Sequence, residues 1–322
     1  MKKIKLISTG GTIAMAKNDD GKLVPEFSGE ELLKGVPKLD DLCRIEVHEF
    51  SKVDSSQMTP QMMFELAQLV KEEVNKSEID GVVVTHGTDT LQETAYMLDL
   101  ILDTSKPVIF TGAMRGVTEL GSDGRANIYQ AFIVALEEKS QNQGVLVVLN
   151  NEIHTAKLLT KSHTTNLASF KSINGGRVGE VSKEEVNYFY NTIPSQTIDS
   201  KSINDNVAYI KMVAGIDPEI VDMMVNSNKF DGLVVEAFGS GTIPSNIASC
   251  LEKAIRSGIV VILTSRCLEG RLHNTYAASN EEKDLEKLGL VFSNGLGGPK
   301  VRIKLMLLLG GNYDKEEISH AF

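Results

Sequence analysis

The sequence predicts an α/β protein with two domains, a larger N-terminal domain built on a parallel sheet and a smaller C-terminal α/β domain. The chain has 322 residues, which is more than one small domain usually holds. Short runs rich in Val and Ile alternate with longer segments of helical period, as in repeated βαβ units. Residues 189–206 are rich in Ser, Asn, Asp and Thr and lack both periods, which is typical of a linker. We therefore expect domains at 1–188 and 207–322.

The strands are predicted from short apolar runs that end in glycine, proline or polar residues. Strands with no polar alternation, such as Gly81–Thr85, are buried on both faces of a sheet. Helices should then cover both faces, which is flavodoxin-like layering. The candidate strands are Ile4–Ser8, Arg44–Phe50, Gly81–Thr85, Pro107–Thr111, Gly144–Leu149, Val207–Met212, Gly232–Glu236 and Ile259–Thr264.

Two helices of the larger domain are predicted from apolar residues at helical spacing. The segment Pro60–Asn75 follows Thr59, which suits an N-cap, and begins with proline, which suits the first helical position. The segment Asp89–Asp103 has an apolar stripe that includes Leu91, Ala95 and Leu98. Both helices should pack on the sheet.

Two threonine-rich turns follow predicted strands. The first threonine turn, Thr9–Thr12, reads Thr-Gly-Gly-Thr, and the second threonine turn, Thr85–Thr90, reads Thr-His-Gly-Thr-Asp-Thr. Open parallel sheets bind ligands outside the carboxyl ends of their strands, so the two turns can surround one small molecule. Neither turn has the G-x-G-x-x-G or Gly-Lys-Ser/Thr pattern of nucleotide-binding loops.

Each threonine turn also has a structural interpretation. A Gly-Gly pair is common wherever a strand reverses tightly. Asp89 and Thr90 open a predicted helix and are residue types that cap helices. In a crevice, however, a carboxylate could hold an ammonium group, and a threonine hydroxyl could act as a nucleophile if a base lay close. Lys161 is a candidate for that base, although a solvated surface lysine is the simpler interpretation.

The composition excludes several classes of function. The net charge of −10 argues against an extended surface for nucleic acid, which requires clustered Lys and Arg. No apolar run approaches the roughly 20 residues of a membrane span. Three distant cysteines and six histidines show no metal-ligand spacing, so no metal is expected. A Ser-His-Asp triad lacks its G-x-S-x-G turn.

The N-terminal segment imitates a signal peptide, with Lys2 and Lys3 before an apolar stretch and Ala14-Met15-Ala16 after it. A signal peptide needs an uninterrupted apolar region of about 7–15 residues, and here Lys5 and the polar first threonine turn interrupt it. We therefore expect an uncleaved, cytoplasmic protein.

At the two threonine turns, and over nearly the whole length, the chain resembles the bacterial-type L-asparaginase family. The matching residues run from Thr9-Gly10-Gly11-Thr12-Ile13-Ala14 through the second threonine turn to Thr160-Lys161 and into the C-terminal region. The resemblance implies hydrolysis of L-asparagine to L-aspartate and ammonia, without a cofactor. It also implies a homodimer or a homotetramer.

The resemblance implies four catalytic residues in the N-terminal domain. Thr12 would be the nucleophile that forms an acyl-enzyme. Thr88 and Lys161 would form a hydroxyl–ammonium pair that relays a proton. Asp89 would orient that pair and bind the substrate α-ammonium group, and backbone N–H groups around Thr88 would stabilise the oxyanion.

The resemblance also implies substrate-binding residues. Ser55 matches the family's loop for the α-carboxylate, with Ser56 and Gln57 beside it. In the second domain Thr242 lies in a loop that family members donate to a neighbouring subunit, often with asparagine at this place. Two further matches in that domain are Tyr276 and Glu282.

The chain departs from the family pattern in the lid that follows Thr12. Family members often place a tyrosine there, but residues 17–28 contain none, and Phe27 has no hydroxyl. The segment Asn18–Gly21 still has the polar composition of a mobile lid. The group that activates Thr12 is therefore left open.

Three alternatives stay open at this stage. A glutaminase-asparaginase differs in substrate by one methylene, which is worth only about 1–3 kcal/mol of discrimination. The second alternative is the asparaginase-like subunit of the archaeal amidotransferase that converts Glu-tRNA to Gln-tRNA. A non-catalytic amino-acid-binding protein would keep the pocket but not the reaction.

Overall fold

The computed structural model describes residues 1–17, 20, 23–273, 286–293 and 295–322. The chain forms two compact units, Met1–Thr197 and Ile198–Phe322, and the expected linker at 189–206 includes this division. Each unit has its own sheet, so the predicted two-domain α/β class is confirmed. The units are described one at a time below.

The first unit is built on one sheet of eight strands in the order β12-β11-β8-β7-β6-β5-β1-β4. The strands from β4 to β7 run parallel, as expected. Three antiparallel strands, β8, β11 and β12, extend one edge, so the sheet is mixed. The bounds are β1 Lys3–Gly10, β4 Arg44–Val53, β5 Gly81–Thr85, β6 Val108–Thr111, β7 Val145–Leu149, β8 Glu152–Thr155, β11 Gly179–Ser182 and β12 Glu185–Tyr188.

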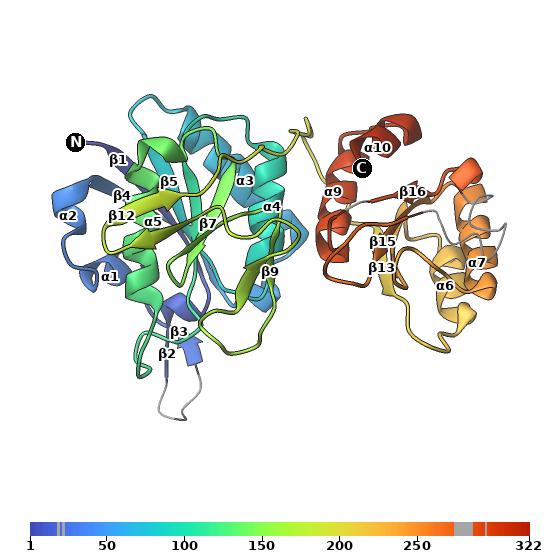
Figure 1. Cartoon of the computed structure of the whole chain (residues 1–322), viewed down its shortest axis with the longest axis horizontal. Helices are drawn as coiled ribbons and strands as arrows, with labels where there is room; N and C mark the ends of the chain where they lie inside the picture. Colours follow the sequence, from blue (N-terminus) through green and yellow to red (C-terminus); the bar gives the residue numbers. More distant parts are fainter. Residues whose placement is uncertain (18–19, 21–22, 274–285, 294) are drawn as a thin grey trace. The chain divides into compact units, whose positions relative to one another are not determined.

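Helices cover both faces of this sheet, as the predicted layering requires (Figure 1). One face packs against α1 (Gly29–Lys34) and α5 (Gly124–Leu136), and α2 (Leu39–Leu42) lies at its side. The other face packs against α3 (Pro60–Asn75) and α4 (Leu91–Ile101). The core under α5 contains alternate strand residues such as Leu6, Val83 and Ile109. The four parallel strands β1, β5, β6 and β7 are therefore closed from water on both sides, whereas the edge strand β4 is partly exposed.

The start of α3 confirms the capping prediction. The Thr59 hydroxyl accepts a hydrogen bond from the Met62 N–H at 3.2 Å, and Pro60 occupies the first helical position. The helix buries Leu66 and Val70 against the sheet. Beneath it, the nearly buried Lys5 of β1 contacts Glu46 at 2.6 Å and Glu73 at 3.7 Å.

Two short hairpins of the first unit lie outside the main sheet. One pairs β2 (Met15–Lys17) with β3 (Leu23–Pro25), and the other pairs β9 (Leu159–Lys161) with β10 (Phe170–Ser172). Two short 3-10 helices, η1 (Thr12–Ala14) and η2 (Ser55–Gln57), follow β1 and β4, and a third, η3 (Glu138–Ser140), follows α5. These short elements carry most of the candidate site residues of this unit.

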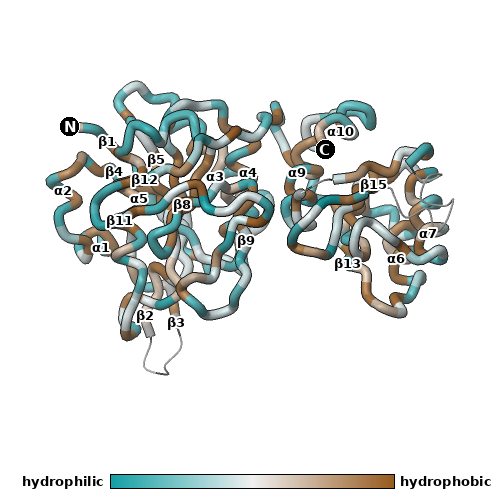
Figure 2. Tube along the Cα trace, in the orientation of Figure 1, coloured by the Kyte–Doolittle hydropathy of each residue, from teal (hydrophilic) through white to brown (hydrophobic). Residues whose placement is uncertain are grey.

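The second unit has a smaller parallel sheet in the order β13-β14-β15-β16. Its core lies between the sheet and the helices α6 and α7, and β15 is apolar from Val260 to Leu263 (Figure 2). The bounds are β13 Val207–Lys211, α6 Pro218–Asn226, β14 Gly232–Ala237, α7 Ser245–Arg256, β15 Val260–Ser265, β16 Val291–Phe292, α9 Gly298–Gly310 and α10 Lys315–Ala321.

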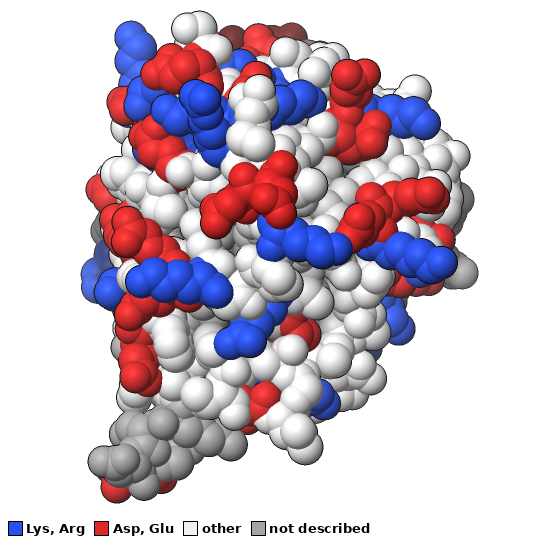
Figure 3. Space-filling model, turned by 90° about the vertical axis from the view of Figure 1, so that its left-hand side faces the viewer, with Lys and Arg blue, Asp and Glu red and all other residues white. Residues whose placement is uncertain are grey.

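The surface shows no sign of a nucleic-acid site on the face drawn in Figure 3. Lys and Arg side chains are interleaved there with Asp and Glu side chains, so no continuous basic patch forms. Among the described residues, no helix is both long and apolar enough to cross a bilayer. The same part of the chain contains no group of three His, Cys, Asp or Glu arranged to hold a metal ion.

Candidate active site

The two threonine turns meet at the carboxyl ends of β1 and β5, which are neighbours in the sheet. A methyl group on Gly11 would fall well inside van der Waals distance of the Gly87 backbone. A methyl group on Gly87 would lie 2.9 Å from Gly11 Cα. Only glycine at both positions permits this approach. Thr12 and Thr88 directly follow these two glycines, so both threonines begin at the point where the two turns are in contact.

A third loop, after β4, completes the junction. The Gly11 N–H donates to the Val53 carbonyl at 3.0 Å, which ties the first threonine turn to the end of β4. Ser55, only 5% exposed, lies against Gly87, where an added methyl group would be 2.6 Å from its Oγ. The strand order β5-β1-β4 brings these three loops to one edge of the sheet.

Ser55 also holds the start of α4. Its hydroxyl accepts from the Asp89 N–H at 3.2 Å, and its carbonyl accepts from the Thr90 hydroxyl at 2.7 Å. Thr90 is the N-cap of α4 but makes no side-chain capping bond. The interpretation of Asp89 and Thr90 as side-chain caps is therefore wrong. The Thr90 hydroxyl is used to join two loops, and the Asp89 carboxylate points to another partner.

That partner is Lys161, on the β9–β10 hairpin. Its ammonium group donates to Thr88 Oγ1 at 2.9 Å and to Asp89 Oδ1 at 2.6 Å. The Lys161 side chain is 18% exposed, Thr88 is 5% exposed, and the Asp89 side chain is 59% exposed. The structure thus brings together three residues that the sequence places 72 and 73 residues apart. The hydroxyl is on the buried side of the pair and the carboxylate is on the open side.

His86, in the second threonine turn, is fully buried and packs against Phe110. Its Nδ1 lies 2.8 Å from the Gly87 carbonyl, which can only accept, so Nδ1 carries the proton. Nε2 has no hydrogen-bond partner in the described part of the chain. Burial lowers the pKa of His86 to about 4, against a small opposing effect of the bond to Gly87. A neutral His86 therefore supports the peptide that leads into Thr88.

Sequence reasoning missed Gln92, in the first turn of α4. Its Oε1 accepts from the Thr160 hydroxyl at 2.9 Å and from the Lys161 N–H at 2.8 Å. The sequence offered one weak signal, because Gln92 comes two residues after Thr90 on the helix that the second threonine turn opens. Nothing in the sequence pointed to a contact with residues 160 and 161.

The other substrate-binding candidates are not gathered at this point. Ser56 and Gln57 lie on the exposed side of η2. Thr242 belongs to the second unit, where its backbone closes a turn with Phe238 through two bonds of 3.0 Å. Tyr276, Glu282 and most of the lid segment Asn18–Gly21 lie outside the described residues.

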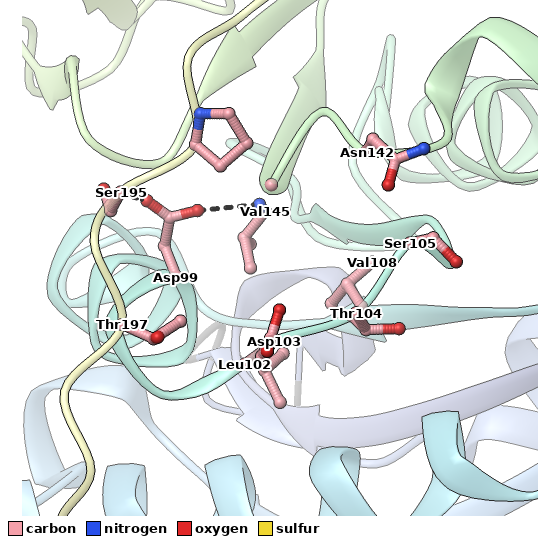
Figure 4. Close-up of a pocket in the computed structure, with 12 residues that line it drawn as sticks. Asp99, Leu102, Asp103, Thr104, Ser105, Val108, Asn142, Val145, Ser195 and Thr197 are labelled. Atoms are coloured by element: carbon pink, nitrogen blue, oxygen red, sulfur yellow. Dashed lines mark hydrogen bonds between the residues drawn. The ribbon is translucent and has the colours of Figure 1, made fainter.

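A cavity of about 400 Å³ lies at the opposite end of the strands and is a poor candidate for a catalytic site (Figure 4). Its buried carboxylate, Asp99, already accepts from the Val145 N–H at 2.8 Å and the Ser195 hydroxyl at 2.5 Å. These bonds join α4, β7 and the segment before the second unit. We assign this carboxylate a structural role.

The arrangement at the carboxyl ends of the strands suits acyl transfer. It combines threonine hydroxyls, one lysine that can move a proton to or from a hydroxyl, and an exposed carboxylate that can bind a cationic group. The hydroxyl of Ser55 can donate to an anionic group because its oxygen accepts from Asp89 N–H. A small zwitterion with an electrophilic side chain fits this set of charges.

Comparisons with known proteins agree with this chemistry. The family model described as Asparaginase, N-terminal matches residues 3–194, and the model described as Glutaminase/Asparaginase C-terminal domain matches residues 206–322. The chain is 32% identical over 322 residues to an L-asparaginase of Bacillus licheniformis, covering 100% of this chain and 99% of that protein.

Two further similarities are to a second bacterial protein and to a solved structure. The chain is 31% identical over 328 residues to L-asparaginase 2 of Escherichia coli, covering 99% of this chain and 92% of that protein. The crystal structure of a probable cytoplasmic L-asparaginase from Campylobacter jejuni matches with a TM-score of 0.89 at 30% identity, covering 100% of this chain and 99% of that chain.

Proposed function

This chain belongs to the asparaginase family, and we propose that it is an L-asparaginase that works through a threonine acyl-enzyme. The observation that carries the proposal is the pair of bonds from the Lys161 ammonium group to Thr88 and Asp89, beside the contact of Gly11 with Gly87. These contacts support a nucleophile, a proton relay and an ammonium site at one edge of the sheet.

In the proposed first half-reaction, the Thr12 oxygen attacks the side-chain amide carbon of asparagine. The Thr12 proton is transferred by way of the Thr88–Lys161 pair to the amide nitrogen, the carbon–nitrogen bond breaks, and ammonia leaves. Backbone N–H groups around Thr88 stabilise the tetrahedral oxyanion. The Asp89 carboxylate holds the substrate ammonium group, and the Ser55 hydroxyl donates to the substrate α-carboxylate.

In the second half-reaction, water attacks the ester carbon of the acyl-enzyme. The Thr88–Lys161 pair takes one proton from that water and returns one to the Thr12 oxygen as the ester bond breaks. The products are aspartate and the free hydroxyl of Thr12. The burial of Thr88 at 5% exposure supports this scheme, since the relay is then shielded from bulk water.

The test is ammonia release from L-asparagine by the wild type and by Thr12→Ala. We expect the variant to lose at least about 10³-fold in kcat, since it lacks the nucleophile. Thr104→Ala is the control, because Thr104 caps a turn at the other end of the sheet through the Lys106 N–H. An inactive wild type, or an active Thr12→Ala, rules the proposal out.

The same assay separates the related activities. Comparing kcat/KM for asparagine and glutamine identifies a glutaminase-asparaginase. Binding of aspartate without turnover of asparagine identifies a non-catalytic homologue. Ammonia release by the isolated chain without ATP argues against a function restricted to an amidotransferase complex.

We also propose a cytoplasmic location and a homo-oligomer. The N-terminal stretch that imitates a signal peptide forms β1, whose Ile4, Leu6 and Ile7 are fully buried in the sheet. In the second unit, Ile220 and Met223 of α6 are exposed apolar residues, which supports a contact with another subunit. Light scattering on the purified chain tests the assembly.

A further inference from the structure

The position of Lys161 depends on a hairpin that is separate from the main sheet. Within the described part of the chain, β9 and β10 pair only with each other, by three residue pairs from Leu159↔Ser172 to Lys161↔Phe170. Leu159 and Phe170 are buried and hold the hairpin to the unit. Such apolar contacts are not directional. The Ser172 hydroxyl at the end of β10 lies 2.9 Å from His154 Nδ1 of β8, but that bond is made opposite Leu159 and does not fix the backbone at Lys161. A lysine with four rotatable side-chain bonds needs a better-defined backbone.

Gln92 supplies a directional contact at the required place. Its Oε1 accepts from the Thr160 hydroxyl at 2.9 Å and from the Lys161 N–H at 2.8 Å. The backbone N–H can only donate, so the amide oxygen, not the amide nitrogen, must face the hairpin. Two donors from successive residues fix both the distance and the rotation of β9 relative to α4.

Gln92 lies on the same segment as the groups that Lys161 binds. Thr88 and Asp89 come just before Thr90, the N-cap of α4, and Gln92 is in the first turn of the helix. The loop from Thr88 to Gln92 therefore holds Lys161 twice, at its backbone through Gln92 and at its ammonium group through Thr88 and Asp89. A shift of β9 would have to break both ends of this clamp.

We propose that Gln92 is a positioning residue, which holds the Lys161 backbone so that the ammonium group reaches Thr88 and Asp89 together. This inference rests on the proposed threonine-relay function. Gln92 does not touch the reacting atoms in this scheme and acts through Lys161.

The test uses two variants of Gln92 and one matched control. Gln92→Met keeps the length of the side chain but removes the acceptor, and Gln92→Glu restores an acceptor oxygen. The control is Gln143→Met. The Oε1 of Gln143 accepts from the Thr192 N–H at 2.8 Å and the Thr192 hydroxyl at 2.7 Å, the same pair of donor types, at the opposite end of the sheet.

Displacement of a catalytic group by about 1 Å costs on the order of 100-fold in rate, so we expect Gln92→Met to lose roughly 10- to 100-fold in kcat. The KM for asparagine should stay within about threefold, because Ser55 and Asp89 are unchanged. Gln92→Glu should recover most of the lost kcat. Gln143→Met should unfold at a lower temperature but keep the wild-type kcat.

A second measurement needs no substrate. Reductive methylation with formaldehyde, followed by mass spectrometry of the peptide that contains Lys161, reports how freely its amine reacts. We expect Gln92→Met to increase the rate at Lys161 several-fold and Gln143→Met to leave it unchanged.

Each result has one meaning. Equal kcat in the wild type and Gln92→Met, no rescue by Gln92→Glu, a change in KM alone, or unchanged methylation of Lys161 overturns the role of Gln92. A wild type that releases no ammonia from asparagine defeats the proposed function. In that case the methylation rates still decide whether Gln92 holds Lys161.

Discussion

The buried His86 predicts a specific loss of stability in mild acid. Its pKa is lowered from the ordinary 6.5 to about 4, chiefly because burial disfavours the charged ring. In the unfolded chain the same ring takes up a proton near pH 6.5. Between these two pKa values the unfolded state binds one more proton than the folded state. Stability must therefore fall as the pH drops from 6.5 towards 4, and this contribution levels off below 4.

The size of the effect follows from these two pKa values. The cost of keeping His86 neutral is small near pH 7 and reaches about 2 kcal/mol at about pH 5. The perturbation is His86→Asn, whose side-chain amide can still donate to the Gly87 carbonyl but does not titrate. The variant should be less stable at pH 7, because the smaller side chain leaves a gap beside Phe110. Between pH 7 and about pH 5, the free energy of unfolding of His86→Asn should fall by about 2 kcal/mol less than that of the wild type.

The assay is urea unfolding, followed by circular dichroism at intervals between pH 7 and pH 5. His320→Asn is the control, because His320 is exposed at the end of α10. Exchange of the imidazole C2 hydrogen, measured by mass spectrometry, gives the pKa of His86 directly. If the difference between the free energies of unfolding of the wild type and His86→Asn is the same at every pH between 7 and 5, the reasoning about burial is refuted.

Two further predictions concern the backbone contact and the acid limit. Gly11→Ala should lower kcat by at least about 100-fold, because its methyl group would push the two threonine turns apart. The control is Gly176→Ala, which has a similar φ of +73° and open space around it and should keep full activity. Comparable kcat values for the two variants would contradict this prediction. The Glu46 pKa is held at about 2 by Lys3 and Lys5, so stability should fall as the pH drops from 4.5 towards 2. Glu46→Gln should weaken that dependence in acid unfolding curves, and an unchanged curve would count against the ion pairs.

Much of the fold could be predicted from local patterns. Each candidate strand is present, some with shifted ends. Most are apolar runs, which favour a sheet interior, whereas Arg44–Phe50 alternates polar and apolar residues, as suits its place at the edge of the sheet. Several short strands were not expected, namely β2, β3, β8 to β12 and β16. One of them is β12, Glu185–Tyr188. It is short and polar and lies at the edge of the sheet, where its backbone pairing to β11 stabilises it. Pairing of that kind leaves no hydrophobic period in the sequence.

The candidate site was predicted in part. Thr88, Asp89 and Lys161 came from a resemblance, and the structure gathers them within hydrogen-bonding distance. The capping interpretation of Asp89 and Thr90 came from residue preference alone and was wrong, because the Thr90 hydroxyl donates to the Ser55 carbonyl and the Asp89 carboxylate accepts from Lys161. A preference describes isolated helices, whereas here a neighbouring loop supplies the partner.

The sequence by itself determined the eight predicted strands, the helices after Thr59 and Thr90, and the turns that carry glycine, threonine and aspartate. These features depend on residues a few positions apart, so local propensity and hydrophobic period reveal them. Only the tertiary structure decided that Gly11 touches Gly87 and that Gln92 holds the residues beside and at Lys161. Parallel strands bring their carboxyl ends to one edge, and a separate hairpin folds back over it. Contacts across 68 to 76 residues arise from that packing and leave no local pattern.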